Sequence, residues 1–461
     1  MDLNSPVFLF LFLPVFIIPY YFSPRRIKLF LGIAGSLFFY AWGNLNYVPL
    51  LLGLTLFAYL LARGINYWRG QRLSFILLWI GILANITLLV GFKLWTGVKY
   101  PLGLSYVTFQ VIAYLVEVHG KASEYEKDVV AFSFYLLFFP KIPVGPITRY
   151  RQLREQIQNI QVEPQDVADG VRRFIRGFAK KALIADTLAK VVTPIFNLDS
   201  PTITPLIAWL VIISYSLQLY FDFSGYTDMA IGVGRMMGFR LVENFNFPYL
   251  SKSIGDFWRR WHISLSSWFR DFVFYPLERR RLKWFGQPLN ILIVFALTGL
   301  WHGLTQNFLI WGLIHGLALI FESTSLGKKL RTAWAPVQHI YALGVILVGW
   351  VFFRSPTSGF ALNFLQRLAG DISGLKTLPF NLTNPLPIIE PTFLLALAAG
   401  ILFSLPVGGW LQKQIDQFTR ERLAVQLPLQ VLYDFWLVFI FLMSVASTAT
   451  AAFQPGIYGT F

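Results

Sequence analysis

Long runs of apolar residues, separated by short polar or basic stretches, dominate the chain. They predict membrane-spanning helices, because ~20 apolar residues cross the hydrocarbon core as one helix. With two weaker runs, Leu102 to Val118 and Val129 to Pro140, we expect an all-α, polytopic integral membrane protein with about 11 crossings. The stronger runs are Leu3 to Phe22, Leu29 to Trp42, Val48 to Ala62, Leu73 to Phe92, Pro205 to Phe221, Leu289 to Trp301, Phe308 to Phe321, Ile340 to Phe353, Phe393 to Leu405 and Leu427 to Ala446.

Several of these runs are too short for a perpendicular span. We therefore expect tilted, broken or re-entrant helices, together with interfacial ones, in a single membrane-embedded domain over residues 1–461. The first run follows Asp2 and precedes Arg25 and Arg26. That charge order is the reverse of a secretory signal, so we expect a retained span whose C-terminal end is cytosolic.

The polar segments indicate an orientation. Asp166 to Val192 has apolar residues at helical spacing with basic residues beside them, which predicts a helix lying flat on the inner leaflet. The loop Ser355 to Pro391 is rich in Pro, Gly and Asn, and we expect it to be extracytoplasmic. The basic clusters, which we place in the cytosol, are Arg63, Arg69 and Arg72; Arg149, Arg151 and Arg154; Arg279, Arg280, Arg281 and Lys283; and Lys328, Lys329 and Arg331.

The composition agrees with a membrane protein. Of 461 residues, 56% are hydrophobic and only 13% are charged, whereas soluble domains carry about 25% charged residues. The formal net charge of +16 fits cytosolic loops and lipid headgroups better than nucleic acid, which we do not expect as a partner. The chain has no cysteine, so disulfides, thiolate metal sites and an acyl-cysteine intermediate are excluded.

His315 is the strongest candidate for chemistry. It lies near the middle of an apolar run, where an ionisable group faces the protein interior and is functional by default. Apolar surroundings keep an imidazole neutral, which is the form that a general base requires. Gly312 and Gly316 form a small-xxx-small pair that lets another helix backbone approach. A histidine hydrogen-bonded between helices is the structural alternative.

Other polar residues have weaker signals. His302 ends the preceding apolar run, and a structural role is as well supported as a functional one. His262 lies among tryptophans and arginines at helical spacing, a pattern typical of one interfacial amphipathic helix. Asp222 and Asp228 flank Gly225 around an expected helix break, where satisfying the helix ends is favoured over holding a cation. We expect no metal site.

Several motifs, in order, resemble the membrane-bound O-acyltransferase superfamily, in its bacterial branch of alginate O-acetyltransferases and teichoic-acid D-alanylation proteins. They are concentrated in residues 100–320. They are P-L-G-L-S-Y-V-T-F-Q from Pro101, F-F-P-K-I-P-V-G-P-I-T-R-Y from Phe138, Q-L-Y-F-D-F-S-G-Y-T-D-M-A-I-G from Gln218, E-N-F-N-F-P-Y-L-S-K-S-I-G-D-F-W-R-R-W-H-I-S-L-S-S-W from Glu243, and T-G-L-W-H-G with W-G-L-I-H-G from Thr298.

The resemblance implies the fold of that superfamily and an intramembrane catalytic histidine at His315, with His262 as the second active-site polar position. It also implies a donor that reaches the site from the cytosol through a tunnel. We expect His315 to act as general base. The residues that we expect to support catalysis or bind substrate are His302, Asn244, Trp311, Arg259 and Arg260.

We therefore expect an O-acyltransferase of the inner membrane. It would use acetyl-CoA or an acyl-carrier thioester as donor substrate, with no bound cofactor, to acetylate an extracytoplasmic polysaccharide, directly or through a periplasmic SGNH-type partner. Arginines, among them Arg149, Arg151, Arg259 and Arg260, would meet the donor phosphates or lipid headgroups. Transfer of D-alanyl or another acyl group, and a non-enzymatic transporter or flippase, are the alternatives; the lack of repeated halves disfavours the transporter.

Overall fold

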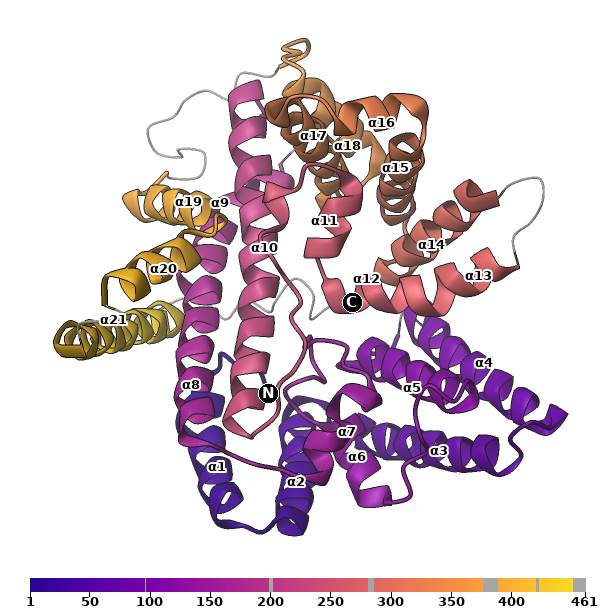
Figure 1. Cartoon of the computed structure of the whole chain (residues 1–461). Helices are drawn as coiled ribbons and strands as arrows, with labels where there is room; N and C mark the ends of the chain where they lie inside the picture. Colours follow the sequence, from indigo (N-terminus) through magenta and orange to yellow (C-terminus); the bar gives the residue numbers. More distant parts are fainter. Residues whose placement is uncertain (96, 199–201, 281–285, 376–388, 420–422, 451–461) are drawn as a thin grey trace. The chain divides into compact units, whose positions relative to one another are not determined.

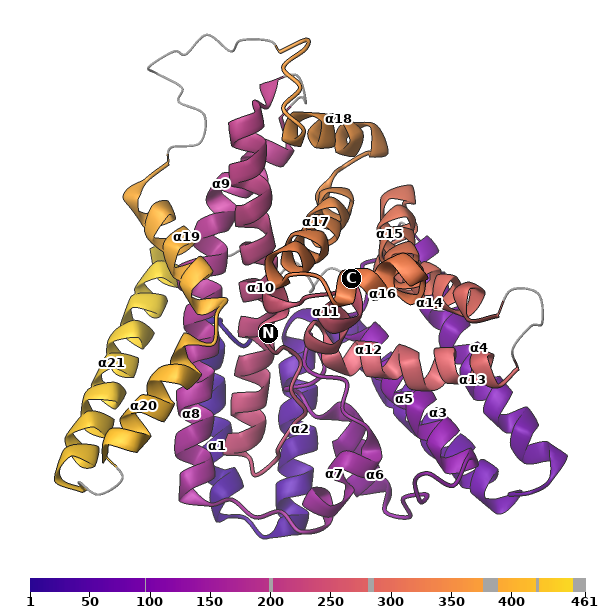
Figure 2. The ribbon, with the colours of Figure 1, turned by 45° about the horizontal axis from the view of Figure 1, so that its top comes forward.

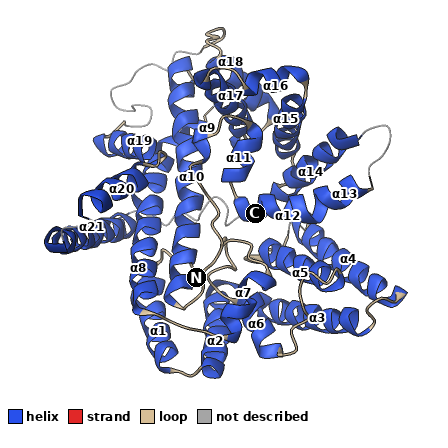
Figure 3. Ribbon diagram, viewed as in Figure 1, coloured by secondary structure: helices blue, strands red, loops and turns tan. Residues whose placement is uncertain are grey.

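The computed structural model describes residues 1–95, 97–198, 202–280, 286–375, 389–419 and 423–450. Within this part of the chain every regular element is a helix and none is a strand (Figure 3). The chain divides into two compact units. Unit 1 contains Met1–Phe178 and Gly225–Glu243, and unit 2 contains Ala179–Ser224 and the described residues from Asn244 to Thr450.

Unit 1 holds the N-terminal helices (Figure 1). A π-helical turn, Phe8–Phe12, precedes α1, and a 3-10 turn, Leu45–Tyr47, separates α2 from α3. The unit also includes most of α8 and the C-terminal part of α10 (Pro205–Met236). Its helices are α1 (Leu13–Phe22), α2 (Arg25–Asn44), α3 (Val48–Tyr67), α4 (Arg72–Leu94), α5 (Leu104–His119), α6 (Val129–Leu137), α7 (Tyr150–Gln158) and α8 (Pro164–Ala179).

Unit 2 begins with the π-helical segment Lys180–Ala185 and ends with three helices that follow the residues 376–388, which are not described (Figure 2). Part of the loop that we expect to be extracytoplasmic lies in that range. The helices are α9 (Asp186–Phe196), α11 (Ile254–Arg260), α12 (Ile263–Phe269), α13 (Tyr275–Arg279), α14 (Gly286–His302), α15 (Gln306–Ser323), α16 (Ser325–Arg331), α17 (Ala335–Arg354), α18 (Ser358–Leu368), α19 (Pro391–Phe403), α20 (Val407–Thr419) and α21 (Leu423–Thr450).

Five described helices are long and apolar enough to cross a membrane, and up to seven spans result if each of two bent helix pairs counts as one. The first bent pair joins α15 to α16 at an angle of 86°. This supports the expected broken helices, while the total of about 11 crossings stays a prediction. The five are Arg25–Tyr67, Arg72–Leu94, Pro205–Met236, Ala335–Arg354 and Leu427–Ala449.

Two sequence motifs of unit 1 pack against each other. Gly103, with φ +69°, precedes α5, and a Cβ there would lie 2.1 Å from the carbonyl oxygen of Ile142. Residues 138–150 are buried although they are mostly not helical. Lys141 is buried with them and donates hydrogen bonds to Gln110 Oε1 and the Tyr135 carbonyl, each at 2.7 Å. Irregular backbone in a membrane protein has to be enclosed in this way.

Within unit 1, α8 lies directly against α10. A Cβ on Gly170 would lie 2.7 Å from the Gly232 carbonyl, and one on Gly177 would lie 2.6 Å from that of Gly225. Small residues therefore permit the close approach. Arg173 of α8 binds Asp228 at 2.7 Å and also Glu243.

The predicted amphipathic helix exists but its charges are placed differently. In unit 2 Lys181 is only 3% exposed and binds Asp222 at 2.7 Å and Asp186 at 2.6 Å. Lys181 and Arg173, two of the basic residues that we expect beside the apolar face of this helix, are therefore held by acidic partners on the protein. That the helix lies flat on the inner leaflet stays a prediction. The predicted break is wrong: Asp222 and Asp228 lie inside the continuous helix α10. Each carboxylate has a basic partner, so neither serves a helix end.

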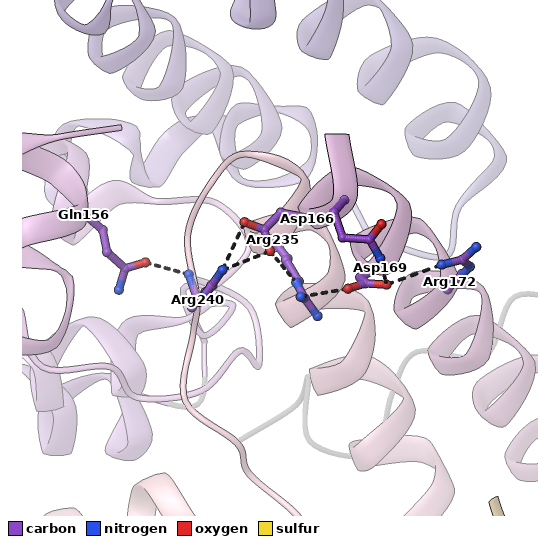
Figure 4. A network of polar contacts seen from close by, with 7 residues as sticks. Gln156, Asp166, Asp169, Arg172, Arg235 and Arg240 are labelled. Carbon is purple, nitrogen blue, oxygen red and sulfur yellow. Dashed lines mark hydrogen bonds and ion pairs between the residues drawn. The ribbon is translucent and has the colours of Figure 1, made fainter. Parts of the chain in front are cut away.

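A second charged network in unit 1 joins the start of α8 to the end of α10 (Figure 4). Asp166 accepts hydrogen bonds from Arg235 at 3.0 Å and from Arg240 at 3.3 Å. Arg235 also binds Asp169 at 2.9 Å, and the backbone N–H of Arg240 donates to Gln156 Oε1 at 2.7 Å. These contacts fix the chain that leaves α10.

Candidate active site

His315 lies on α15 and is fully buried in unit 2. Its ring is surrounded by aromatic side chains of α11, α14, α17 and of α15 itself. α14 and α15 pack side by side because Gly312 has no side chain at their contact. A Cβ at this position would lie only 2.3 Å from the Phe295 carbonyl oxygen. The expected small-xxx-small contact is thus confirmed. Ring-centroid distances from His315 are 5.3 Å to Trp258, 5.4 Å to Trp311, 5.9 Å to Phe257, and 6.4 Å to both Phe295 and Trp350.

The imidazole of His315 has no hydrogen-bond partner in the described part of the chain, at either Nδ1 or Nε2. A buried polar atom without a partner costs about 1–3 kcal/mol, so this arrangement is disfavoured in a purely structural histidine. On α17, Gly349 faces Nε2: a Cβ there would lie only 2.9 Å from this nitrogen. Glycine therefore keeps a methyl-sized position beside Nε2 clear.

Trp311 connects His315 to His302. Its ring is 5.4 Å from His315 and 4.9 Å from His302, and both contacts are edge-to-face. His302 ends α14, is buried, and also contacts Phe353 at 5.0 Å. The indole N–H groups of Trp311 and Trp258 have no acceptor among the described residues. The structure thus places His302 and Trp311 in one cluster with His315.

His262 forms a second polar cluster with Asn244 and Ser264. His262 and Asn244 are each 1% exposed. Nδ1 of His262 lies 3.1 Å from Asn244 Oδ1, and the same oxygen accepts hydrogen bonds from the backbone N–H of Ser264 at 3.1 Å and its hydroxyl at 2.9 Å. The backbone carbonyl of Asn244 accepts from Ile263 at 3.0 Å. Two segments distant in sequence are therefore joined around one amide.

These contacts define the chemical form of His262. A backbone N–H can only donate, so the Asn244 atom facing Ser264 is the amide oxygen, and His262 must donate to it from Nδ1. Nε2 then carries the lone pair. Burial lowers the pKa of the His262 imidazole to about 3, which keeps it neutral at physiological pH. Its ring also contacts Phe223 edge-to-face at 4.7 Å.

The prediction of one amphipathic helix around His262 is wrong. α11 ends at Arg260 and α12 begins at Ile263, with His262 in the left-handed region at φ 43° and ψ 54°. The break turns the imidazole into the protein. The hydrogen bonds of Asn244 and the packing of Trp261, 5.6 Å from Phe257 and 5.1 Å from Trp350, favour this conformation over a continuous helix.

The candidate arginines lie outside these clusters. Arg259 and Arg260 both pair with Asp256, at 3.5 and 3.0 Å, and the Arg259 side chain is 72% exposed. In unit 1, Arg149 and Arg151 bind the buried Glu117, at 3.6 and 3.3 Å. Among the residues that the structure describes, no group of three or more His, Asp or Glu is placed to hold a metal ion.

Sequence reasoning did not single out Ser264 or Gly349. Ser264 lies two residues after His262 and hydrogen-bonds the same amide, but its partner Asn244 is distant in sequence. Gly349 is one of 35 glycines, and only the packing of α17 against α15 shows what it does.

The two buried histidine clusters lie among apolar helices, several of which are long enough to cross a membrane. Residues 78–352 match the model of the MBOAT, membrane-bound O-acyltransferase family, and the chain belongs to this family. It is therefore a multi-pass membrane acyltransferase, which decides against the transporter.

The chain is similar to curated relatives that transfer acyl groups to polymers. It is 37% identical to a protein of Azotobacter vinelandii named as probable alginate O-acetylase AlgI, over 77% of this chain and 75% of that protein. Identity is 33% to a peptidoglycan O-acetyltransferase of Helicobacter pylori, over 80% and 79% of the two chains. It is 32% to a teichoic acid D-alanyltransferase of Bacillus subtilis, over 65% and 81%.

Proposed function

We propose that this chain takes acetyl groups from a cytosolic thioester, acetyl-CoA or an acyl carrier, for O-acetylation of an extracytoplasmic polysaccharide. The observation that carries the proposal is His315, a buried imidazole with both nitrogens unpartnered among the described residues. Relatives named for alginate and peptidoglycan O-acetylation support the acetyl group and the polymer.

The reaction is a proton-balanced acyl transfer. Nε2 of His315 takes the proton of the acceptor hydroxyl while its oxygen attacks the thioester carbonyl carbon. The carbonyl oxygen becomes an oxyanion. The C–S bond then breaks, the carbonyl re-forms, and the imidazolium returns its proton to the leaving thiolate. The products are an acetyl ester and a free thiol, so no further reactant is needed.

The neighbouring side chains have distinct parts in this proposal. The indole N–H groups of Trp311 and Trp258 are buried donors suited to the oxyanion, and preorganised donors of this kind are worth about 3–4 kcal/mol each. His262, fixed by Asn244, orients the acceptor hydroxyl through its Nε2 lone pair. His302 supports Trp311 by packing on its ring.

Donor and acceptor reach the site from opposite sides of the inner membrane in this proposal. The exposed Arg259, with Arg260, offers a guanidinium surface to the donor phosphates. The acceptor is the polymer itself or a serine of a periplasmic SGNH-type partner that passes the acetyl group on.

Because the chain has no cysteine, a single engineered cysteine at Arg280→Cys is the only thiol that a reagent can label. Ready labelling in intact cells by an impermeant thiol reagent would contradict a cytosolic position for this loop.

The decisive experiment gives the purified, lipid-reconstituted protein labelled acetyl-CoA, acetyl carrier protein or D-alanyl carrier protein, with a polysaccharide acceptor. We expect acetyl label in the acceptor and one free thiol per ester formed. Transfer of D-alanine alone would assign the chain to the other branch of the family. Release of no thiol from any donor, with the acceptor and partner present, would overturn the proposal.

A further inference from the structure

Glu322 links the helix of His315 to the helix that leads to His262. It lies seven residues after His315 on α15, and therefore on nearly the same helix face. Its carboxylate accepts hydrogen bonds from the backbone N–H groups of Ile254, at Oε1, and of Gly255, at Oε2 and 3.1 Å. These are the first two residues of α11. Glu322 is only 7% exposed.

The carboxylate completes the hydrogen bonding at the start of α11. The first N–H groups of a helix have no partner inside it and need one elsewhere. Ser253 Oγ accepts from Asp256 at 3.0 Å, and the Ser253 carbonyl accepts from Phe257 at 2.9 Å. Glu322 supplies acceptors for the two that are left. A carboxylate also interacts favourably with the positive end of the helix.

Glu322 is itself held at a fixed place. It stands one residue before the end of α15, where the chain bends by 86° into α16. Its backbone carbonyl accepts a hydrogen bond from Arg331 at 2.8 Å. A Cβ on Gly327 would lie 2.5 Å from its Cα, so the turn packs closely against it. The backbone that carries the carboxylate is therefore held in place.

Through these hydrogen bonds Glu322 holds α11, the helix that forms one side of the candidate site. α11 has seven residues, and its Phe257 and Trp258 lie against the His315 ring at 5.9 and 5.3 Å. Two residues after α11 ends, the chain reaches His262. A shift of α11 at its N-terminus would therefore move His262 relative to His315.

We propose that Glu322 is a positioning residue that sets the placement of His262 relative to His315. The inference rests on the proposed acyl transfer. Glu322 does not touch the substrates in this scheme. It acts through α11, and misplacing reacting groups by about 1 Å costs on the order of 100-fold in rate.

The test is a double-mutant cycle on the full-length reconstituted protein. Glu322→Gln keeps the size of the side chain but turns an NH₂ donor toward a backbone N–H. We expect kcat per folded molecule to fall about 10- to 100-fold with the donor KM unchanged. Because the variant would act through His262, adding it to His262→Ala should cost less than about 3-fold more. Glu278→Gln is the control: Glu278 accepts from Asn290 at 2.9 Å and is a member of neither histidine cluster, so kcat should be unaffected.

Either of two results would overturn the inference: normal kcat in Glu322→Gln, or the same fold-loss in the presence and absence of His262. If Glu322→Gln does not fold, Glu322→Asp replaces it in the same cycle, since it keeps the charge but is one methylene shorter. Thermal midpoints measured in parallel separate lost folding from lost turnover. Failure of the proposed function is distinguishable, because the unmodified protein would then transfer no acyl group.

Discussion

The charged network of unit 1 and the His315 cluster of unit 2 differ in whether their polar side chains have partners. Asp166, Asp169, Arg235 and Arg240 are all engaged with one another through ion pairs (Figure 4). His315 is more deeply buried than any of them, and neither of its nitrogens has a partner in the described residues. Paired charges hold helices together, whereas an unpaired imidazole costs stability and is explained by binding a reactant.

The comparison predicts that variants in the histidine clusters lose turnover and keep stability, while variants in the charged network do the reverse. After His315 itself, the largest loss of transfer is expected for His262→Ala. Removing a group that orients the acceptor should reduce transfer about 10- to 1000-fold. Donor binding should be nearly unchanged, because His262 is not a phosphate ligand. The measurement is donor-thioester binding beside the transfer rate. Collapse of binding, with normal turnover of the complex that still forms, would show that the role assigned to His262 is wrong.

Gly349→Ala tests the space beside His315. The new methyl would lie 2.9 Å from Nε2 and 3.3 Å from Trp311 Cδ1, so the imidazole has to move. We expect transfer to fall about 10-fold or more. Gly344→Ala is the matched control on the same helix, because a Cβ there has nothing within 4 Å. Equal activity of the two variants would contradict the assignment of Nε2 as the reacting nitrogen.

Asp166→Asn tests the charged network and should have the smallest effect on rate. Hydrogen bonds to charged groups contribute about 1.5–3 kcal/mol, so we expect the thermal midpoint at neutral pH to fall by several degrees. Transfer at low temperature should stay within about 2-fold. Glu163→Gln, an exposed side chain just before Asp166, should leave the midpoint unchanged. A loss of turnover in Asp166→Asn without a loss of stability would contradict the purely stabilising role of this network.

The same network predicts an acid dependence of stability. Burial raises the pKa of Asp166, but the hydrogen bonds from Arg235 and Arg240 outweigh it, and the pKa lies below its usual value. The carboxylate therefore stabilises the fold above its unfolded pKa of about 3.9, and this contribution is lost as pH falls through the lower folded value. The midpoint of Asp166→Asn should fall less than that of the unmodified protein between about pH 5 and pH 3. Parallel curves would contradict this.

The sequence predicted the parts of the site that depend on local pattern. The apolar run around His315 predicted a histidine inside the protein, and the glycines four residues apart predicted the close contact of its helix with α14. The structure has both features. The break before α12 was missed, because Trp258, Trp261 and Leu265 satisfy a helical repeat, while the hydrogen bonds that stop the helix come from Asn244.

The partners of Glu322 and Asp222 were missed for a similar reason. An acidic residue at the end of an apolar run has the same local pattern whether it faces water or binds a backbone 67 residues away. Asp222 binds Lys181, which lies 41 residues earlier in the chain. The pattern of residues around either position does not reveal that the two are partners. Such pairings follow from tertiary packing, which one sequence does not reveal.

The most direct test of this account compares His315→Ala with His339→Ala under matched expression and thermal stability. His339 is in the same unit, and its Nδ1 lies 3.2 Å from the Ser251 carbonyl, so it has the partner that His315 lacks. Acyl transfer should fall about 100- to 10,000-fold in His315→Ala and stay near normal in His339→Ala. Near-normal transfer by His315→Ala would contradict the claim that its unpartnered imidazole is the catalytic base.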